Sequence, residues 1–74
     1  MSQVLDVRGL NCPLPVLRTK KAMKSVQKGE VLTVEATDPQ APSDIAALCE
    51  AAGFTLLSQE QRDGVFTFRI QQAA

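Results

Sequence analysis

The sequence predicts an α+β fold, a two-layer α/β sandwich in which two helices cover one face of a four-stranded mixed sheet. Its 74 residues suffice for one small domain, residues 1–74, and no linker, repeat or low-complexity tract divides them. Apolar residues make up 45% of the chain and charged residues 22%, which is typical of a globular protein and not of a disordered one. Segments with strand and helix periodicity alternate in the order βαβαββ, which favours two packed layers.

The first half of the chain is predicted to form a strand, a helix and a second strand. Residues 3–8 and 30–37 alternate between apolar and polar positions, which indicates two strands with one buried face each. Residues 13–27 carry apolar or neutral side chains at helical spacing, and Gly29 is suited to cap the end of this helix. The positions expected to face the core are Leu5, Val7, Val16, Thr19, Met23, Val26, Leu32, Val34 and Ala36.

A second helix is predicted after the turn that Asp38-Pro39 marks. Pro42 suits its first position, because the first N–H groups of a helix have no partner within the helix. The helix is expected to run to about Ala52, with Gly53 as its cap. Its apolar stripe contains Ile45, Leu48, Cys49 and Ala52.

A hairpin is predicted to complete the sheet. Residues 54–60 and 65–71 have the pattern of strands. Asp63-Gly64 lies between them, and this dipeptide is a strong signal for a tight two-residue hairpin turn.

The two cysteines are expected to play different parts. Cys49 shares the apolar stripe of the second helix, so we expect it to pack in the core. Cys12 precedes Pro13 and Pro15, and both prolines fall at the start of the first helix, where proline costs little. The alternative is that Cys12 is an ordinary small apolar residue, but Gly9, the prolines and the basic surroundings favour a functional thiol.

The expected position of Cys12 leads to a prediction about its acidity. A helix N-terminus carries partial positive charge, and Arg8 and the basic helix would add to it. We therefore expect the thiol pKa to fall below its free value of about 8.5. Gly9, Pro13 and Pro15 are the residues expected to support the thiol and fix its direction.

Basic residues concentrate in one segment, although the net charge of the chain is zero. Six basic residues and no acidic residue lie between positions 7 and 29, whereas seven acidic residues and two basic ones follow. Such a positive face can attract an acidic protein or a nucleic acid, although many charged segments are merely solvated. The residues expected to dock a partner are Arg8, Arg18, Lys20, Lys21 and Lys24.

The chain lacks the residues that several kinds of site and reaction require. With two cysteines and no histidine, the chain has too few soft ligands for a structural zinc site, and it has no Cys-x-x-Cys pair and no Gly-rich phosphate loop. No base is evident to activate a nucleophile for acyl transfer. Sulfur transfer asks for less, since it needs an exposed thiolate and a surface that docks donor and acceptor. We expect neither a metal nor a cofactor.

The chain is expected in the cytoplasm, where thiols are kept reduced. Its first residues have neither a basic region nor the apolar stretch of a signal peptide. No apolar run approaches the roughly 18 residues of a membrane span, so we expect no membrane partner.

Around Cys12 the sequence resembles the TusA/SirA-like sulfur carrier proteins. The resemblance is carried by the Cys-Pro-x-Pro motif at residues 12–15, preceded by Gly9-Leu10 and followed by Lys20-Lys21-Ala22. Further matches in the family's order and spacing are Gly29-Glu30, Thr37-Asp38-Pro39, Asp44-Ile45, Cys49 and Gly53. The resemblance covers nearly the whole chain.

This resemblance implies a fold, an activity and partners. The fold is βαβαββ with sheet order 1-2-4-3, like the C-terminal domain of translation initiation factor three. The activity is that of a sulfurtransferase, in which Cys12 accepts sulfur as a persulfide from a cysteine desulfurase or a rhodanese-like donor and passes it to an acceptor protein. The protein is expected to be a monomer.

The resemblance leaves two pathways open. One branch of the family passes sulfur through a relay to 2-thiouridine in tRNA, and another serves sulfur oxidation. Members of the tRNA branch can have an acid where this chain has Leu14 and a histidine where it has Phe54.

The alternative function is a small nucleic-acid-binding or regulatory interaction module that uses the basic first helix. The chain has three Phe but no Tyr or Trp, and no aromatic residue lies among the cations to stack on bases. We therefore expect no direct contact with nucleic acid. Neither alternative explains a cysteine placed between Leu10 and two prolines.

Overall fold

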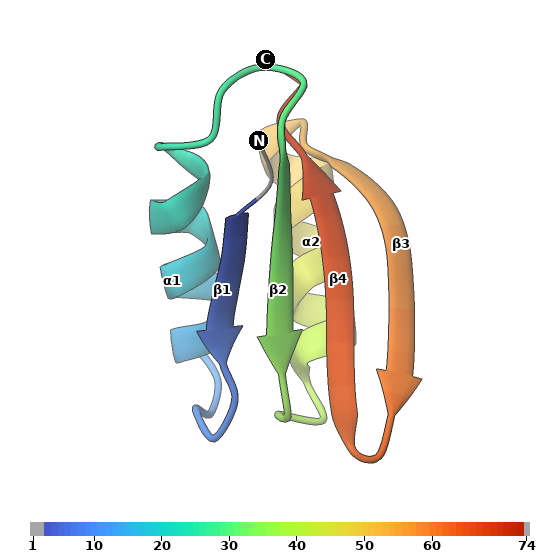
Figure 1. The fold of residues 1–74 in the computed structure, drawn as a ribbon. Helices are drawn as coiled ribbons and strands as arrows, with labels where there is room; N and C mark the ends of the chain where they lie inside the picture. The colour runs from blue at the N-terminus through green and yellow to red at the C-terminus, as the bar shows by residue number, and fades with distance from the viewer. Residues whose placement is uncertain (1–2, 74) are drawn as a thin grey trace.

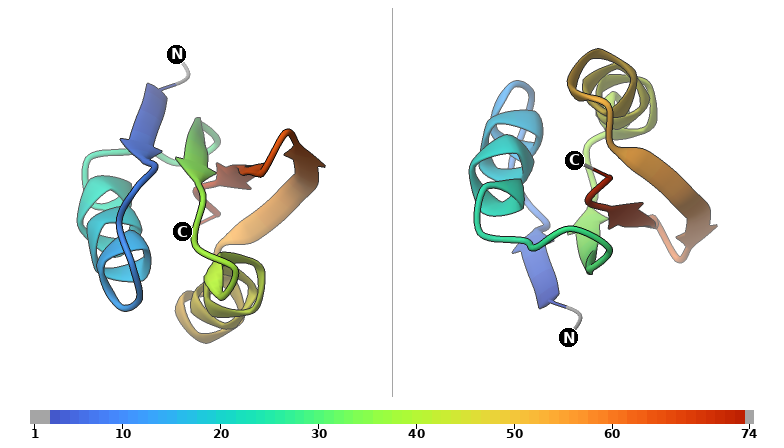
Figure 2. Two further views of the ribbon diagram at one scale, coloured as in Figure 1. Left: turned by 90° about the horizontal axis from the view of Figure 1, so that it is seen from below. Right: turned by 90° about the horizontal axis from the view of Figure 1, so that it is seen from above.

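The protein forms two layers, a mixed sheet and a pair of helices, in a computed structural model that describes residues 3–73 (Figure 1). The elements are β1 (Gln3–Val7), α1 (Leu14–Met23), β2 (Val31–Ala36), α2 (Ala41–Ala52), β3 (Thr55–Arg62) and β4 (Val65–Gln71). The sheet order is β1-β2-β4-β3, in which β1 and β2 are parallel and the other neighbours antiparallel. Both helices lie on the same side of the curved sheet (Figure 2). The predicted fold class, element order and strand order are confirmed.

The core lies between the helices and one face of the sheet. Strand register brings alternate residues of the central strands together, so that Leu32 is opposite Ile70 and Val34 is opposite Phe68. All four side chains are buried. From the helices, Met23 and Ile45 are fully buried against this face, as the apolar spacing predicted. No helix of residues 3–73 lies over the opposite face of the sheet (Figure 2).

The first helix is shorter than predicted, and Gly29 does not cap it. α1 ends at Met23, and the chain continues through i→i+3 hydrogen bonds, among them Ser25 N–H to Ala22 C=O at 3.0 Å and Val26 N–H to Met23 C=O at 3.2 Å. These tighter turns still bury Val26 in the core, which explains why the apolar spacing continued past the helix end. Gly29, at φ +86°, instead turns the chain into β2.

The second helix and the hairpin follow the predicted pattern closely. α2 begins at Ala41, so Pro42 is its second residue and not its first. Gly53 ends the helix in the left-handed conformation at φ 78°, as predicted for a cap. Asp63 and Gly64 both have positive φ, which is the geometry of the tight turn that matches the twist of paired strands.

Within residues 3–73, no helix has the length and apolar character that crossing a membrane requires.

Candidate functional site

The loop that carries Cys12 lies beside the loop that follows β2. β1 and β2 are adjacent parallel strands, so the carboxyl ends of both strands lie at the same end of the sheet, at the bottom of Figure 1. We call residues 8–13 the cysteine loop and residues 37–40 the aspartate loop. Loops at the carboxyl ends of parallel strands are where sheets of this kind commonly build their sites.

Two hydrogen bonds connect these loops. The N–H of Gly9 donates to Oγ1 of Thr37 at 2.9 Å, and the N–H of Cys12 donates to Oδ2 of Asp38 at 2.6 Å. The other carboxylate oxygen of Asp38 accepts the N–H of Gln40 at 3.1 Å, so the side chain bridges the cysteine loop and the start of α2. Asp38 is only 8% exposed, and its carboxylate therefore holds the backbone of Cys12 in place.

The prolines form the start of α1, as the sequence indicated. Pro13 is the residue before the first helical residue, and Pro15 is the second residue of the helix. The Cys12–Pro13 peptide bond is cis. Leu14 is helical although a proline follows it, and its N–H donates to the C=O of Asn11 at 2.9 Å. Pro15 is buried and its C=O accepts the hydroxyl of buried Thr19 at 2.7 Å, which anchors this turn to the core.

Cys12 is exposed and lies at a groove between α1 and α2. The groove has a volume of about 420 Å³. Its lining residues are Cys12, Pro13, Val16, Leu17, Lys20, Asp44, Ala47 and Leu48. The lining is largely apolar and includes one cation from α1, Lys20, and one carboxylate from α2, Asp44.

The expectation of a lowered thiol pKa is wrong. The pKa of Cys12 is raised above its ordinary value, first by its hydrogen bond with Asp44, then by desolvation, and then by the charges of Asp44 and Asp38. These carboxylates disfavour a thiolate, and the partial charge of a helix N-terminus is too weak to outweigh a hydrogen-bonded carboxylate.

Arg8 is not among the groups that shift the pKa of Cys12, although the sequence predicted that it would favour the thiolate. Its Nε and Nη2 donate to Oδ1 and Oδ2 of Asp6 at 2.9 and 3.0 Å. These side-chain hydrogen bonds lower the pKa of Asp6 to about 2. The guanidinium is therefore already paired with Asp6, a carboxylate of β1 two residues earlier.

The other predicted docking cations lie on different sides of α1. Lys20 lines the groove that contains Cys12. Arg18 and Lys21 line a second groove, between α1 and β1. Lys24 is exposed just after the last residue of the helix. The structure thus brings one of the five cations to the groove beside the thiol.

Cys49 packs in the core, with 4% of its surface exposed. Burial raises the pKa of its thiol, which favours the neutral form. This is the environment of a structural cysteine and not of a reactive one.

The sequence interpretation missed the roles of Asp38 and Asp44. Asp38 carries a turn signal in the sequence, and this local role hides its hydrogen bond to a residue 26 positions away. Asp44 has the ordinary place of an acid in the first turn of a helix. The only sequence signal for a role of either residue was that both belong to the motifs that this chain shares with the family it resembles.

Comparison with known proteins finds similar sequences along nearly the whole chain. Residues 3–72 match the family described as "Sulfurtransferase TusA". A sulfur carrier protein TusA from Allochromatium vinosum is 42% identical over 71 residues, which are 96% of this chain and 93% of that protein. A Neisseria meningitidis protein that is provisionally named as a sulfur carrier is 54% identical over 70 residues, or 95% of each chain.

A solved structure shows the same fold. The crystal structure of a SirA-like protein from Desulfitobacterium hafniense superposes with a TM-score of 0.85 at 27% identity. The match covers 97% of this chain and 99% of that one.

Proposed function

The chain belongs to the TusA family of sulfur carrier proteins, and on this premise we propose that Cys12 carries the sulfur, as a persulfide. The observation that supports this assignment is the contrast between the two thiols. Cys12 is exposed at a groove between two helices, whereas Cys49 is buried. Exchange of sulfur between proteins requires a thiol that a second protein can reach.

Loading is a displacement at the outer sulfur of a donor persulfide. The Cys12 thiolate attacks this sulfur, a new S–S bond forms, and the donor's own S–S bond breaks with its electron pair leaving on the donor thiolate. Asp44 accepts a hydrogen bond from the thiol, so it is the group placed to receive the proton as the attack begins. No external oxidant or reductant is required, because the sulfur atom moves at a constant oxidation state.

Unloading repeats the same displacement, with Cys12 now as the leaving group. A thiolate leaves more slowly as its pKa rises, and the carboxylates raise the pKa of Cys12. The persulfide is therefore retained longer on Cys12. This retention suits a carrier, which must hold sulfur between two partners.

Gly9, Pro13 and Pro15 support the thiol in this proposal. Gly9, at φ 81°, turns the chain after β1 and donates its N–H to the aspartate loop. Pro13 precedes the first residue of α1 and Pro15 is its second residue, so Cys12 lies where the helix starts. Substituting Gly9 would place a side chain in a backbone conformation that L-residues rarely adopt.

The groove beside Cys12 is the proposed docking surface for donor and acceptor. Its apolar lining fits a loop that presents a cysteine, and Lys20 would pair with an acidic side chain next to that cysteine. Of the remaining predicted docking cations, Arg18, Lys21 and Lys24 would act by attraction at longer range, and Arg8 would contribute less because it is paired with Asp6. The donor is a cysteine desulfurase or a rhodanese-like protein in the cytoplasm, and the acceptor belongs to tRNA thiolation or to sulfur oxidation.

Loading can be tested by mass measurement. The protein is incubated with a cysteine desulfurase, cysteine and pyridoxal phosphate, and its intact mass is read before and after addition of a thiol reductant. We expect a gain of one sulfur atom that the reductant removes, that Cys12→Ser abolishes and that Cys49→Ser retains. Loading that survives Cys12→Ser and disappears in Cys49→Ser would refute the assignment.

A further inference from the structure

We propose that the free edge of β1, together with the groove between β1 and α1, binds an extended acidic segment of a partner protein as an added strand. β1 is an edge strand, because the sheet order places β2 on one side of it and no described strand on the other. An open strand edge offers unpaired backbone N–H and C=O groups to an incoming chain. Main-chain pairing gives such a complex its affinity, and pockets beside the strand give it specificity.

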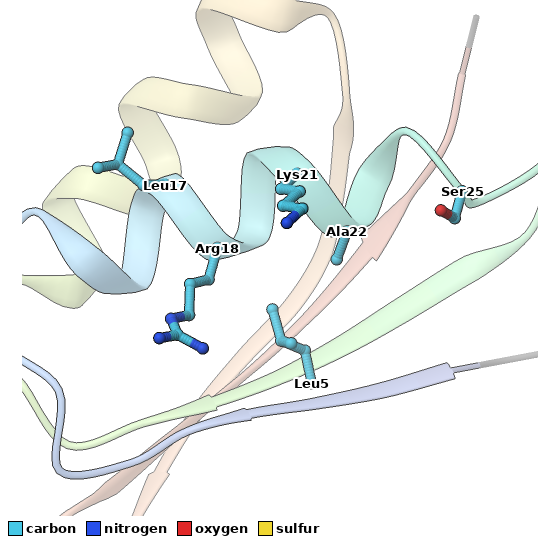
Figure 3. Close-up of a pocket in the computed structure, with 6 residues that line it drawn as sticks. All are labelled: Leu5, Leu17, Arg18, Lys21, Ala22 and Ser25. Atoms are coloured by element: carbon cyan, nitrogen blue, oxygen red, sulfur yellow. The ribbon is translucent and has the colours of Figure 1, made fainter.

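A groove of about 560 Å³ lies between β1 and α1 and is larger than the groove at Cys12. Its lining residues are Leu5 from β1 and Leu17, Arg18, Lys21, Ala22 and Ser25 from α1 and the turn after it. In Figure 3, Leu5 rises from β1 toward the helix, while Arg18 and Ala22 point from α1 toward the strand. Alternate side chains of an added strand would enter this space, since successive residues of a strand point to opposite faces.

The charges in the groove specify the chemistry of the segment. Arg18 and Lys21 line it, and neither forms an ion pair with any residue between 3 and 73. The acid of β1 itself, Asp6, is already held by Arg8 through two side-chain hydrogen bonds. The groove therefore has two available cations above an apolar floor, which fits a segment with acidic and apolar side chains.

The two edges of the sheet differ in a way that supports this assignment. β3 forms the other edge, and it carries Glu60 and Arg62 together with a register shift between Leu56 and Ser58. Charges and bulges are devices that prevent an edge from pairing with another chain. β1 has no bulge in its register with β2, and its Val4 is 70% exposed.

A second copy of this chain is a poorer occupant than a foreign acidic segment. Symmetric pairing of two β1 edges would bring Arg18 and Lys21 of one copy toward those of the other, and like charges repel.

The groove does not include Cys12, so the inference does not depend on persulfide chemistry.

The test is an NMR titration of the isotopically labelled protein with a short peptide of alternating valine and glutamate. We expect shifts for the amides of residues 3–7 and for the residues of α1 that line the groove, with the β3 amides as an internal control that stays unchanged. The same peptide with alternate backbone nitrogens methylated cannot pair as a strand, and a valine-lysine peptide has the wrong charge. Both should fail to bind.

Two double variants test whether the cations of the groove bind the peptide. Arg18→Glu with Lys21→Glu should weaken peptide binding about tenfold, as expected for two lost ion pairs. Lys28→Glu with Arg69→Glu makes the same change in net charge outside the groove and should have little effect. Cys12→Ser should bind the peptide as the unaltered protein does.

Several results would overturn the inference. These are unchanged β1 amides at saturating peptide, equal shifts at β1 and β3, equal binding of the methylated peptide, or a requirement for Cys12. An oligonucleotide that shifts the same amides more strongly than the peptide, or a dimer formed through β1, would assign the edge to another occupant.

Discussion

Asp44 and Asp38 control the ionisation of the Cys12 thiol. Asp44 does so through a hydrogen bond and through its charge, and Asp38 through its charge. With its pKa raised, the resting thiol is protonated at neutral pH, so unwanted alkylation and oxidation are slow. In the proposed reaction the proton must leave as the thiol attacks a persulfide, and Asp44 is the group proposed to receive it.

Asp44→Asn should lower the pKa of Cys12, because it removes the largest cause of the upward shift. The thiolate fraction at neutral pH then rises, so iodoacetamide should react faster and the midpoint of its pH–rate profile should move to lower pH. Persulfide on Cys12 should also be lost faster to a free thiol, since a thiolate of lower pKa leaves faster.

The matched control is Glu50→Gln, which removes an exposed acid from the same helix and should leave the profile unchanged. A midpoint that stays in place or rises in Asp44→Asn would show that Asp44 does not act on the thiol as described.

At the scale of elements, the site depends on two loops brought together by the parallel pairing of β1 and β2. Gly9 and Cys12 of the cysteine loop donate to Thr37 and Asp38 of the aspartate loop. The position of the thiol is therefore coupled to the end of β2 and the start of α2, and not to α1 alone.

Thr37→Val should lower the free energy of unfolding by about 1 kcal/mol, because it removes the acceptor of the Gly9 N–H and keeps the shape of the side chain. Sulfur loading should slow as the cysteine loop loosens. Thr33→Val is the matched control on β2, where no side-chain hydrogen bond is lost among the described residues, and chemical denaturation compares the two. If Thr37→Val and Thr33→Val are equally stable and are loaded with sulfur at equal rates, the hydrogen bond of the Gly9 N–H does not position the cysteine loop.

At the scale of the whole molecule, local sequence signals predicted the fold well. The Asp63-Gly64 turn, the Gly53 cap and the alternation within β2 each specify a local geometry that the final structure keeps. The length of α1 was overestimated. Val26 reaches the core through a tighter turn after the helix, and this turn continues the helical spacing of apolar residues.

The acidity of Cys12 was not predictable in the same way. It depends on carboxylates that lie far away in the sequence and approach the thiol only when β1 and β2 pair. A helix N-terminus is a local signal, whereas the position of Asp44 relative to Cys12 is a property of the assembled fold. The sequence was enough to single out Cys12 as the candidate site residue, whereas prediction of its electrostatics required the tertiary structure.

Sulfur discharge from the isolated, loaded protein tests the central claim most directly, because a carrier must release what it receives. The protein is loaded with radioactive sulfur from labelled cysteine by a desulfurase, separated from the donor, and mixed with an acceptor thiol. We predict that label on the peptide containing Cys12 falls as label on the acceptor rises by an equal amount, and that Cys12→Ser carries no label at any stage. Label that stays on the protein, or that resides on the peptide containing Cys49, would contradict the account.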